Sequence, residues 1–195
     1  MGKAFGRLVL IALVVFGLWY VFSHYRGAAN FGCNVAAGDV AHAATGGCPD
    51  SVAQADSNAQ WAGARIDTIK DERVTTGLFY DEDGHEHKYD SSQNSDSDTA
   101  LQVGRQLGVF PKVGRPSVVD HVEVKVAAVM RSTGVTTGVL VINNPAGPCA
   151  RAGISVEPMS CLASMPRVLP PAATLVVWWR QSDGGLKNQI FRGGQ

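Results

Sequence analysis

The sequence lacks a net charge. Lysine and arginine together number 17, as do aspartate and glutamate, so the formal net charge is zero. A neutral chain is not expected to coat nucleic acid by bulk electrostatic attraction, although a local basic surface is compatible with this balance. Charged residues usually form a solvated face, so little weight falls on four basic residues that lie in or near the segment 121–161: Lys125, Arg131, Arg151 and Arg167. A length of 195 residues allows one domain of ordinary size plus additional segments.

Cysteine is scarce, and the four cysteines fall into two pairs. Cys33 and Cys48 bracket a short segment rich in alanine and glycine. If the chain is exported, this pair would close a small disulfide loop. Two free thiols are the alternative, which an oxidising compartment disfavours. Cys149 and Cys161 form the second pair and belong to a different pattern.

A convincing small-x-small cleavage site is also lacking after the N-terminal apolar run at residues 8–22, where Gly27-Ala28-Ala29 is a weak candidate. The run is long for the core of a signal peptide and short for a membrane-spanning helix. Lys3 and Arg7 precede it, which favours an N-terminus inside the cell and export of the rest. We expect residues 1–26 to form an apolar helix that acts as an uncleaved anchor or, less favoured, as a cleaved signal. The protein would then be membrane-anchored through residues 8–22 or secreted, with its C-terminal domain outside the cytoplasm of the producing cell.

Composition divides the remainder into two parts. Residues 27–60 are rich in glycine, alanine, asparagine and serine, and we expect a flexible linker there. The folded domain is expected at 61–195, with helices that alternate with apolar strands. We expect strands at 74–80, 86–89, 138–143 and 173–179, and helices at 99–107, from Asp120 onward and at 162–169. This alternation predicts an α/β sandwich built on a mixed sheet. Asp98 and Asp120 are the expected N-caps of the first two helices.

The residues of greatest chemical interest are His121, Glu123, Cys149 and Cys161. Zinc held by three protein ligands keeps a fourth position for water and lowers the pKa of that water to about 7. A carboxylate that is not a ligand then moves protons. Nucleobase deaminases of this type carry H-x-E followed by P-C-x-x-C. Here the triplet is His121-Val122-Glu123, and Cys149 follows a proline.

The second cysteine departs from that pattern, because a long loop separates Cys149 from Cys161. Zinc imposes tetrahedral geometry and not sequence spacing, so such a loop is compatible with a site. Ser160 is placed to cap a short helix beginning at Cys161, whose N-terminus would favour a thiolate. The alternative is that His121 and Glu123 are solvated helix residues and that the cysteines form a disulfide.

The segments HVEVKVAAVMRSTG, VLVINNPAGPC and CLASMPRVLPPAATLVVWW resemble the DddA-like deaminase toxins of bacterial secretion systems. The similarity covers roughly the last two thirds of the chain and is densest from His121 to Trp179. It implies a three-layer cytidine-deaminase-like sandwich and hydrolysis of cytosine to uracil in DNA. By this resemblance the zinc ligands are His121, Cys149 and Cys161, and Glu123 is the proton shuttle. DNA, single- or double-stranded, would be the substrate, and a cognate immunity protein would be a partner.

Two adjacent asparagines lie at the end of the expected strand at 138–143 and directly after it. Asn143 and Asn144 are candidates for binding the substrate sugar or base, and a turn-forming pair before Pro145 is an equal alternative. Trp178 or Trp179 could stack on a flipped base, although core packing is the preferred interpretation.

The preferred function is thus an exported or membrane-tethered deaminase toxin. One alternative is a non-catalytic secreted binding module held by two disulfides, and another is a deaminase of free nucleosides. Glu123 separates the first from the binding module, because a module gains nothing from an acid beside a metal-facing histidine.

Overall fold

The sheet of this protein has five strands in the order β2-β1-β3-β4-β5. The computed structural model describes residues 31–33, 48–149 and 159–194. The strands are β1 (Thr76–Tyr80), β2 (Glu86–Asp90), β3 (Thr137–Ile142), β4 (Thr174–Arg180) and β5 (Leu186–Arg192). β3 and β4 are parallel, and all other neighbouring strands are antiparallel. The mixed sheet predicted from the sequence is confirmed.

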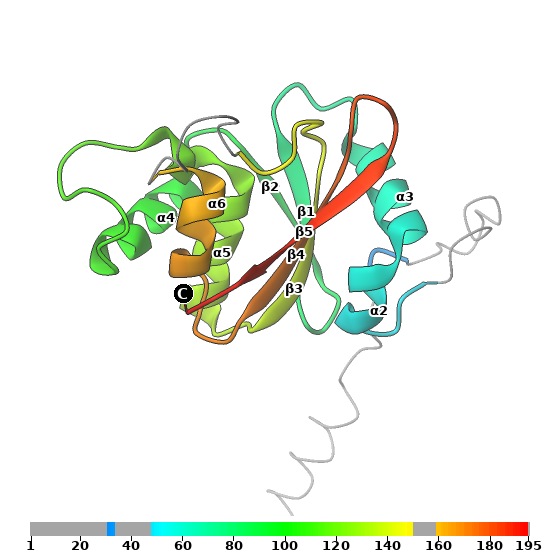
Figure 1. Cartoon of the computed structure of the whole chain (residues 1–195), viewed down its shortest axis with the longest axis horizontal. Coiled ribbons are helices and arrows are strands. Elements are labelled where there is room, and N and C mark those ends of the chain that lie inside the picture. Colours follow the sequence, from blue (N-terminus) through cyan, green and yellow to red (C-terminus); the bar gives the residue numbers. More distant parts are fainter. Residues whose placement is uncertain (1–30, 34–47, 150–158, 195) are drawn as a thin grey trace, which may run out of the picture.

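Helices cover both faces of this sheet (Figure 1). One face carries α2 (Val52–Ser57) and α3 (Ala59–Ile69), and the other carries α4 (Ser95–Gln106), α5 (Val122–Thr133) and α6 (Cys161–Val168). A short 3₁₀ helix, η1 (Ser117–Asp120), leads into α5. The arrangement is a three-layer α/β sandwich, as predicted.

The packing of the central strand β3 explains why its sequence is a continuous apolar run. Val139 and Val141 pack into the cluster beneath α2 and α3, whereas Leu140 and Ile142 pack into the cluster beneath α4, α5 and α6. All four side chains are fully buried. A strand covered on both faces has no polar side and appears as a continuous apolar run.

Several segments that carry the candidate site residues meet at one edge of the sheet, the edge where β3 ends. The loop that follows β3 lies at this edge, together with the N-terminal ends of α5 and α6 (upper part of Figure 1). The pairing register places the start of β1 and the end of β2 at the same edge, because Thr76 lies opposite Asp90 and Gly77 opposite Ile142. The β1–β2 turn lies at the opposite edge, next to the pair Tyr80 and Glu86.

The described parts of the segment expected to be a linker, residues 31–33 and 48–60, take part in the fold. Ser51 caps α2 by accepting a hydrogen bond from the Gln54 amide, and Val52 and Ala55 of α2 are buried. The folded part therefore extends N-terminal to residue 61, because small residues suffice to pack a short helix against β3.

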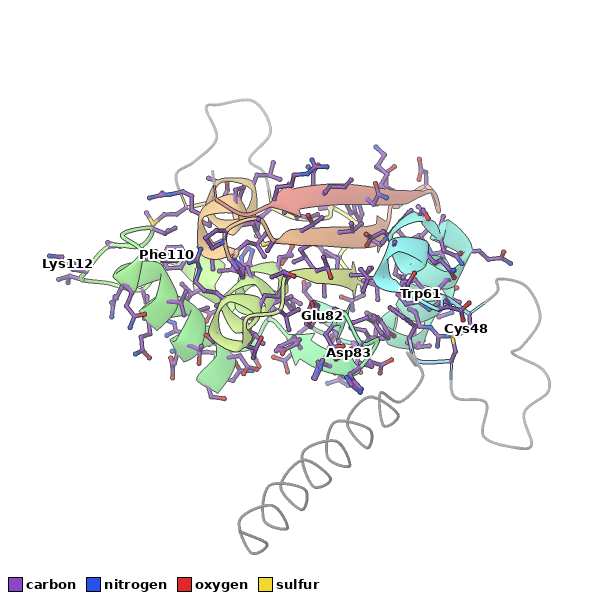
Figure 2. All side chains as sticks on the ribbon, turned by 90° about the horizontal axis from the view of Figure 1, so that it is seen from below. Cys48, Trp61, Glu82, Asp83, Phe110 and Lys112 are labelled. Atoms are coloured by element: carbon purple, nitrogen blue, oxygen red, sulfur yellow. A yellow bond between two sulfur atoms is a disulfide. The ribbon has the colours of Figure 1, made fainter. Side chains whose placement is uncertain are left out.

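Phe31 and a disulfide secure the chain before α2. Phe31 is fully buried and packs against Trp61 and Tyr80, with ring centroids 6.1 and 6.2 Å away. Its amide donates to the carbonyl of Gly84 in the β1–β2 turn at 2.9 Å. Cys33 and Cys48 form the disulfide anticipated for that pair. Figure 2 shows Cys48 and Trp61 at one end of the molecule, and Lys112 at the other.

The start of α4 and the presence of β5 differ from the sequence prediction. α4 begins at Ser95 and not at residue 99, because the Asn94 side chain accepts hydrogen bonds from the amides of Asp96 and Ser97 and completes a capping box. The predicted Asp98 cap is therefore wrong. β5 was not predicted, because this edge strand is mostly exposed and carries polar residues.

None of the helices in the described ranges is long and apolar enough to span a membrane. The apolar run at residues 8–22, and with it the expected anchor, lies outside the described residues.

Candidate metal centre

His121 and Glu123 lie where α5 begins. His121 is the N-cap of this helix, with an extended backbone (φ −71°, ψ 137°). Its carbonyl oxygen accepts hydrogen bonds from the amides of Val124 and Lys125, both at 3.1 Å. The prediction that Asp120 caps this helix is therefore wrong. The Asp120 carboxylate instead accepts a hydrogen bond from Arg115 at 2.8 Å, and Asp120 closes η1.

The sulfur atoms of Cys149 and Cys161 both lie close to the imidazole ring of His121. The Nδ1 atom of His121 lies 3.2 Å from the Sγ of Cys161. The sulfurs of Cys149 and Cys161 are 2.8 Å apart, and both residues are free cysteines. Ser160 caps α6 as predicted, because its side chain accepts a hydrogen bond from the amide of Ala163. α6 therefore presents Cys161 from its first turn.

The donor set fits a transition-metal ion. The ligand atoms of His121, Cys149 and Cys161 all lie within 4.8 Å of one another. Bonds of about 2.0–2.3 Å from one ion to nitrogen and sulfur require such a grouping. Imidazole and thiolate donors suit zinc, and three protein ligands leave one position open, as in catalytic sites. The three residues selected from the sequence could therefore hold a metal ion together.

Hydrogen bonds at this cluster favour a thiolate at Cys149 and not, as expected, at Cys161, whose pKa is raised by the hydrogen bond with Cys149 and by burial. The backbone amide of Cys161 donates to the Sγ of Cys149 at 2.9 Å. Hydrogen bonding from Cys161, together with the neighbouring His121, lowers the pKa of the Cys149 thiol to about 4. A thiolate is the form in which cysteine binds metals.

Glu123 is buried beside the cluster. Its side chain is 2% exposed, and burial raises its pKa to about 7. An acid–base group works best when its pKa lies near the operating pH. The Glu123 carboxyl group does not belong to the group of His121, Cys149 and Cys161 that could hold a metal ion.

A cavity of ≈ 330 Å³ opens onto these residues. Its lining residues lie at the edge of the sheet where β3 ends: Thr75, Ser91, Ser117, Asp120, His121, Glu123 and Asn144. Ligand pockets in proteins span about 300–1,000 Å³, so this one suits a small ligand. Hydroxyl, amide and carboxyl groups on its wall match a polar molecule.

The two candidate asparagines have different places. Asn144 lines the cavity, and its side chain also accepts from the amide of Ala146 at 3.2 Å and donates to the carbonyl of Gly147 at 2.9 Å. Asn143 is not among the lining residues. Its amide group instead bonds the backbone before and within β1, including the Thr76 amide at 2.8 Å. These contacts give Asn143 a structural role, and its candidate role in substrate binding stays a prediction.

Four lining residues were not selected from the sequence: Thr75, Ser91, Ser117 and Asp120. The place of one lysine also differs from the expectation. Ser91 lies in a polar loop that gave no functional signal, and Thr75, which the sequence places in a strand, precedes β1 instead. Lys125, considered as part of a basic surface, is fully buried. Arg131 likewise bonds the backbone, donating to the Val168 carbonyl at 2.5 Å. Trp178 packs in the core, as preferred from the sequence.

Comparison with known proteins identifies the family. No curated protein matches the chain. The family model of the SCP1.201-like deaminases matches residues 47–194, which include α2 and every later helix and strand of the described structure. The match covers the histidine, both cysteines of the cluster and Glu123. Because it extends over most of the sequence, and because the three-layer sandwich agrees with a cytidine-deaminase-like fold, the chain belongs to the SCP1.201-like deaminase family.

Proposed function

We propose that this protein is a zinc-dependent hydrolytic deaminase that converts cytosine to uracil in DNA. The observation that carries the proposal is the grouping of His121, Cys149 and Cys161 within 4.8 Å, in a chain that belongs to a deaminase family. The buried Glu123 and the adjoining cavity supply the remaining parts of such a site. The resemblance to DddA-like toxins supports cytosine in DNA as the substrate.

The metal and the protein have separate tasks in this proposal. Zinc, when bound by the three side chains, lowers the pKa of a water molecule at its open position to about 7. Deamination adds the water oxygen to C4 of cytosine, protonates N3 and breaks the bond from C4 to the exocyclic nitrogen, which leaves as ammonia. Glu123 takes one proton from water and delivers it to N3. It then takes the second proton from the hydroxyl group added at C4 and delivers it to the departing nitrogen, so that the C4 carbonyl of uracil forms as ammonia leaves. Its pKa of about 7 suits both acceptance and donation of this proton.

The cavity supports a single base as the reacting unit. A base inside a stack is out of reach, so enzymes of this type act on unstacked or flipped nucleotides. A cavity of ≈ 330 Å³ is small for an intact nucleotide pair. The hydroxyl groups of Thr75 and Ser91 and the amide of Asn144 offer donors and acceptors for the edge of a pyrimidine.

We further propose that the protein is a bacterial toxin, membrane-tethered or secreted, with a cognate immunity protein. The apolar run at residues 8–22 and the preceding positive residues support export. The Cys33–Cys48 disulfide is typical of an oxidising compartment. Phe31 is bonded to the β1–β2 turn, at the sheet edge opposite the cavity. A tether attached there leaves the cavity accessible to DNA.

The test uses the full chain loaded with zinc and three substrates: single-stranded DNA, duplex DNA and free cytidine. Uracil should form in at least one DNA. Glu123→Gln keeps the size of the side chain and should lower the rate by about 10²–10⁴ without loss of zinc. Expression of the wild type in cells should be toxic and raise C-to-T changes, and the variant should do neither. Turnover of free cytidine alone would favour a nucleoside deaminase, and absence of turnover with every substrate would contradict the proposal.

A further inference from the structure

Thr75 and Ser91 form one continuous wall of the cavity. The amide of Ser91 donates to the carbonyl of Thr75 at 2.8 Å. These residues directly adjoin the last cross-strand pair of β1 and β2, Thr76 opposite Asp90. The wall therefore extends the β1–β2 ladder by one step beyond the strands.

Lys125 holds the Ser91 side of this wall. Its side chain reaches from α5 and is fully buried. Its Nζ donates to the carbonyls of Asp90 at 2.7 Å and Ser92 at 2.5 Å, and to the Oδ1 of Asn94 at 3.0 Å. These three acceptors match the three N–H donors of an ammonium group. Two of them are the carbonyls on either side of Ser91, so the position of Ser91 is fixed from both directions.

Asn143 holds the Thr75 side in the same manner. Its Oδ1 accepts from the amide of Thr76 at 2.8 Å, and its Nδ2 donates to the carbonyl of Val74 at 3.2 Å. A further bond from Nδ2 reaches the carbonyl of Ile69 at 3.0 Å. Each wall residue is therefore flanked by backbone groups that one side chain binds together.

We infer that Thr75 and Ser91 contact the base in the cavity and that Lys125 and Asn143 are positioning residues that hold this wall. The inference rests on the proposed function. Lys125 lies two residues after Glu123 on α5. The helix that carries the acid–base group thus also fixes the wall, so the base and the carboxyl group are kept in one frame. Bonds from a charged donor are stronger than neutral ones, which suits a lysine to this task.

Steady-state kinetics of the zinc-loaded full chain test the role of Lys125. Lys125→Met keeps the length of the stem and removes the three donors. Displacement of Ser91 removes its hydrogen bond to the base, so kcat/KM should fall by about tenfold. Because the wall binds the base before and during reaction, the loss should appear mainly in KM.

Arg131→Met is the matched control. Arg131 also lies on α5 and also bonds backbone carbonyls, those of Val168 and Leu169, but these belong to the end of α6 and not to the cavity. Its kcat/KM should stay near that of the wild type. A loss in Lys125→Met that appears in kcat with KM unchanged, or an equal loss in Arg131→Met, would overturn the inference.

A double-mutant cycle with Ser91→Ala identifies the route of the effect. Ser91→Ala should lower kcat/KM by about tenfold in the wild type, the typical effect of one lost hydrogen bond to a ligand. In the Lys125→Met background it should have little further effect, because Ser91 is already displaced. In the Arg131→Met background its full effect should remain. Additive losses of Lys125→Met and Ser91→Ala would show that Lys125 does not act through Ser91.

Amide hydrogen exchange separates this inference from the proposed function, because it needs no substrate. Lys125→Met should speed exchange of the Ser91 amide, whereas Arg131→Met should leave it protected. Unchanged protection in Lys125→Met would contradict the positioning role even in an active enzyme. If Lys125→Met loses protection of the Ser91 amide and the wild type deaminates no substrate, Lys125 does position Ser91 but the proposed deaminase function is wrong.

Discussion

The backbone amide of Cys161 donates a hydrogen bond to the Sγ of Cys149 at 2.9 Å. The first turn of α6 thus supplies one cysteine of the cluster and stabilises the sulfur of the other. This contact explains how a long separation in sequence is compatible with a compact site, since the start of α6 fixes both sulfurs irrespective of the chain between them.

Metal binding is the first prediction. The purified protein should contain about one zinc ion per chain, as other three-ligand sites do. Cys149→Ser and Cys161→Ser should each lose it, because each removes one of three protein ligands. Elemental analysis by mass spectrometry measures the content. The pair of variants Cys33→Ser and Cys48→Ser is the control and should retain zinc. A disulfide between Cys149 and Cys161 in active protein would contradict the metal site.

A second prediction concerns the loop that delivers Cys149. Gly147 has φ +69°, and a Cβ there would lie 2.5 Å from the Trp179 ring. Gly147→Ala should lower the free energy of unfolding by about 1–3 kcal/mol through backbone strain, with an added cost from the clash. It should also weaken zinc retention against a chelator, because Cys149 follows two residues later.

Gly184→Ala is its control. Gly184 has φ +85°, but a Cβ there meets no atom of the described residues within 4 Å. This variant should show the strain alone and retain zinc as the wild type does. Equal zinc loss in both variants would mean that the contact with Trp179 does not position Cys149.

The disulfide before α2 gives a third prediction. Cys33 and Cys48 are 15 residues apart, and a closed loop of this length stabilises a fold by about 3 kcal/mol. Replacing both by serine should lower the free energy of unfolding by that order in urea titrations. Reductant should destabilise the wild type similarly and leave the double variant unchanged. If reductant has no effect on the wild type, the disulfide does not secure Phe31 and the chain before α2.

Asp56 gives a pH-dependent prediction. Burial raises the pKa of this carboxyl group in α2 from 3.8 to about 6. Its Oδ1 is buried without a hydrogen-bond partner among the described residues. The folded state therefore binds a proton more tightly than the unfolded state. As the pH rises from about 4 to about 6, ionisation of Asp56 lowers the free energy of unfolding of the protein.

Asp56→Asn removes that titration. The variant should have the same Tm as the wild type below pH 4, and its advantage should grow up to about pH 6 and then stay constant. Thermal unfolding followed across this range by circular dichroism measures the difference. An advantage that is independent of pH would show that charge burial is not the cause.

The sequence by itself determined that the fold is a layered α/β sandwich and which residues form the candidate metal site. The apolar run of β3 has no polar alternation because helices cover both faces, and periodicity reports this directly. Ser160 before Cys161 predicts the start of α6, since a cap acts within one helical turn. His121, Cys149 and Cys161 could be selected because the chemistry demands their side chains.

Only the tertiary structure decided what the polar residues around the cluster do. Asn143 bonds backbone groups 67 to 74 residues away, and Lys125 bonds groups more than 30 residues away. Phe31 is buried because Trp61 and Tyr80 enclose it. Local patterns report which face of a helix or strand is apolar, but a hydrogen-bond partner depends on which distant segments the sheet brings together. The composition of the cavity wall therefore follows from the pairing of β1 with β2 and β3.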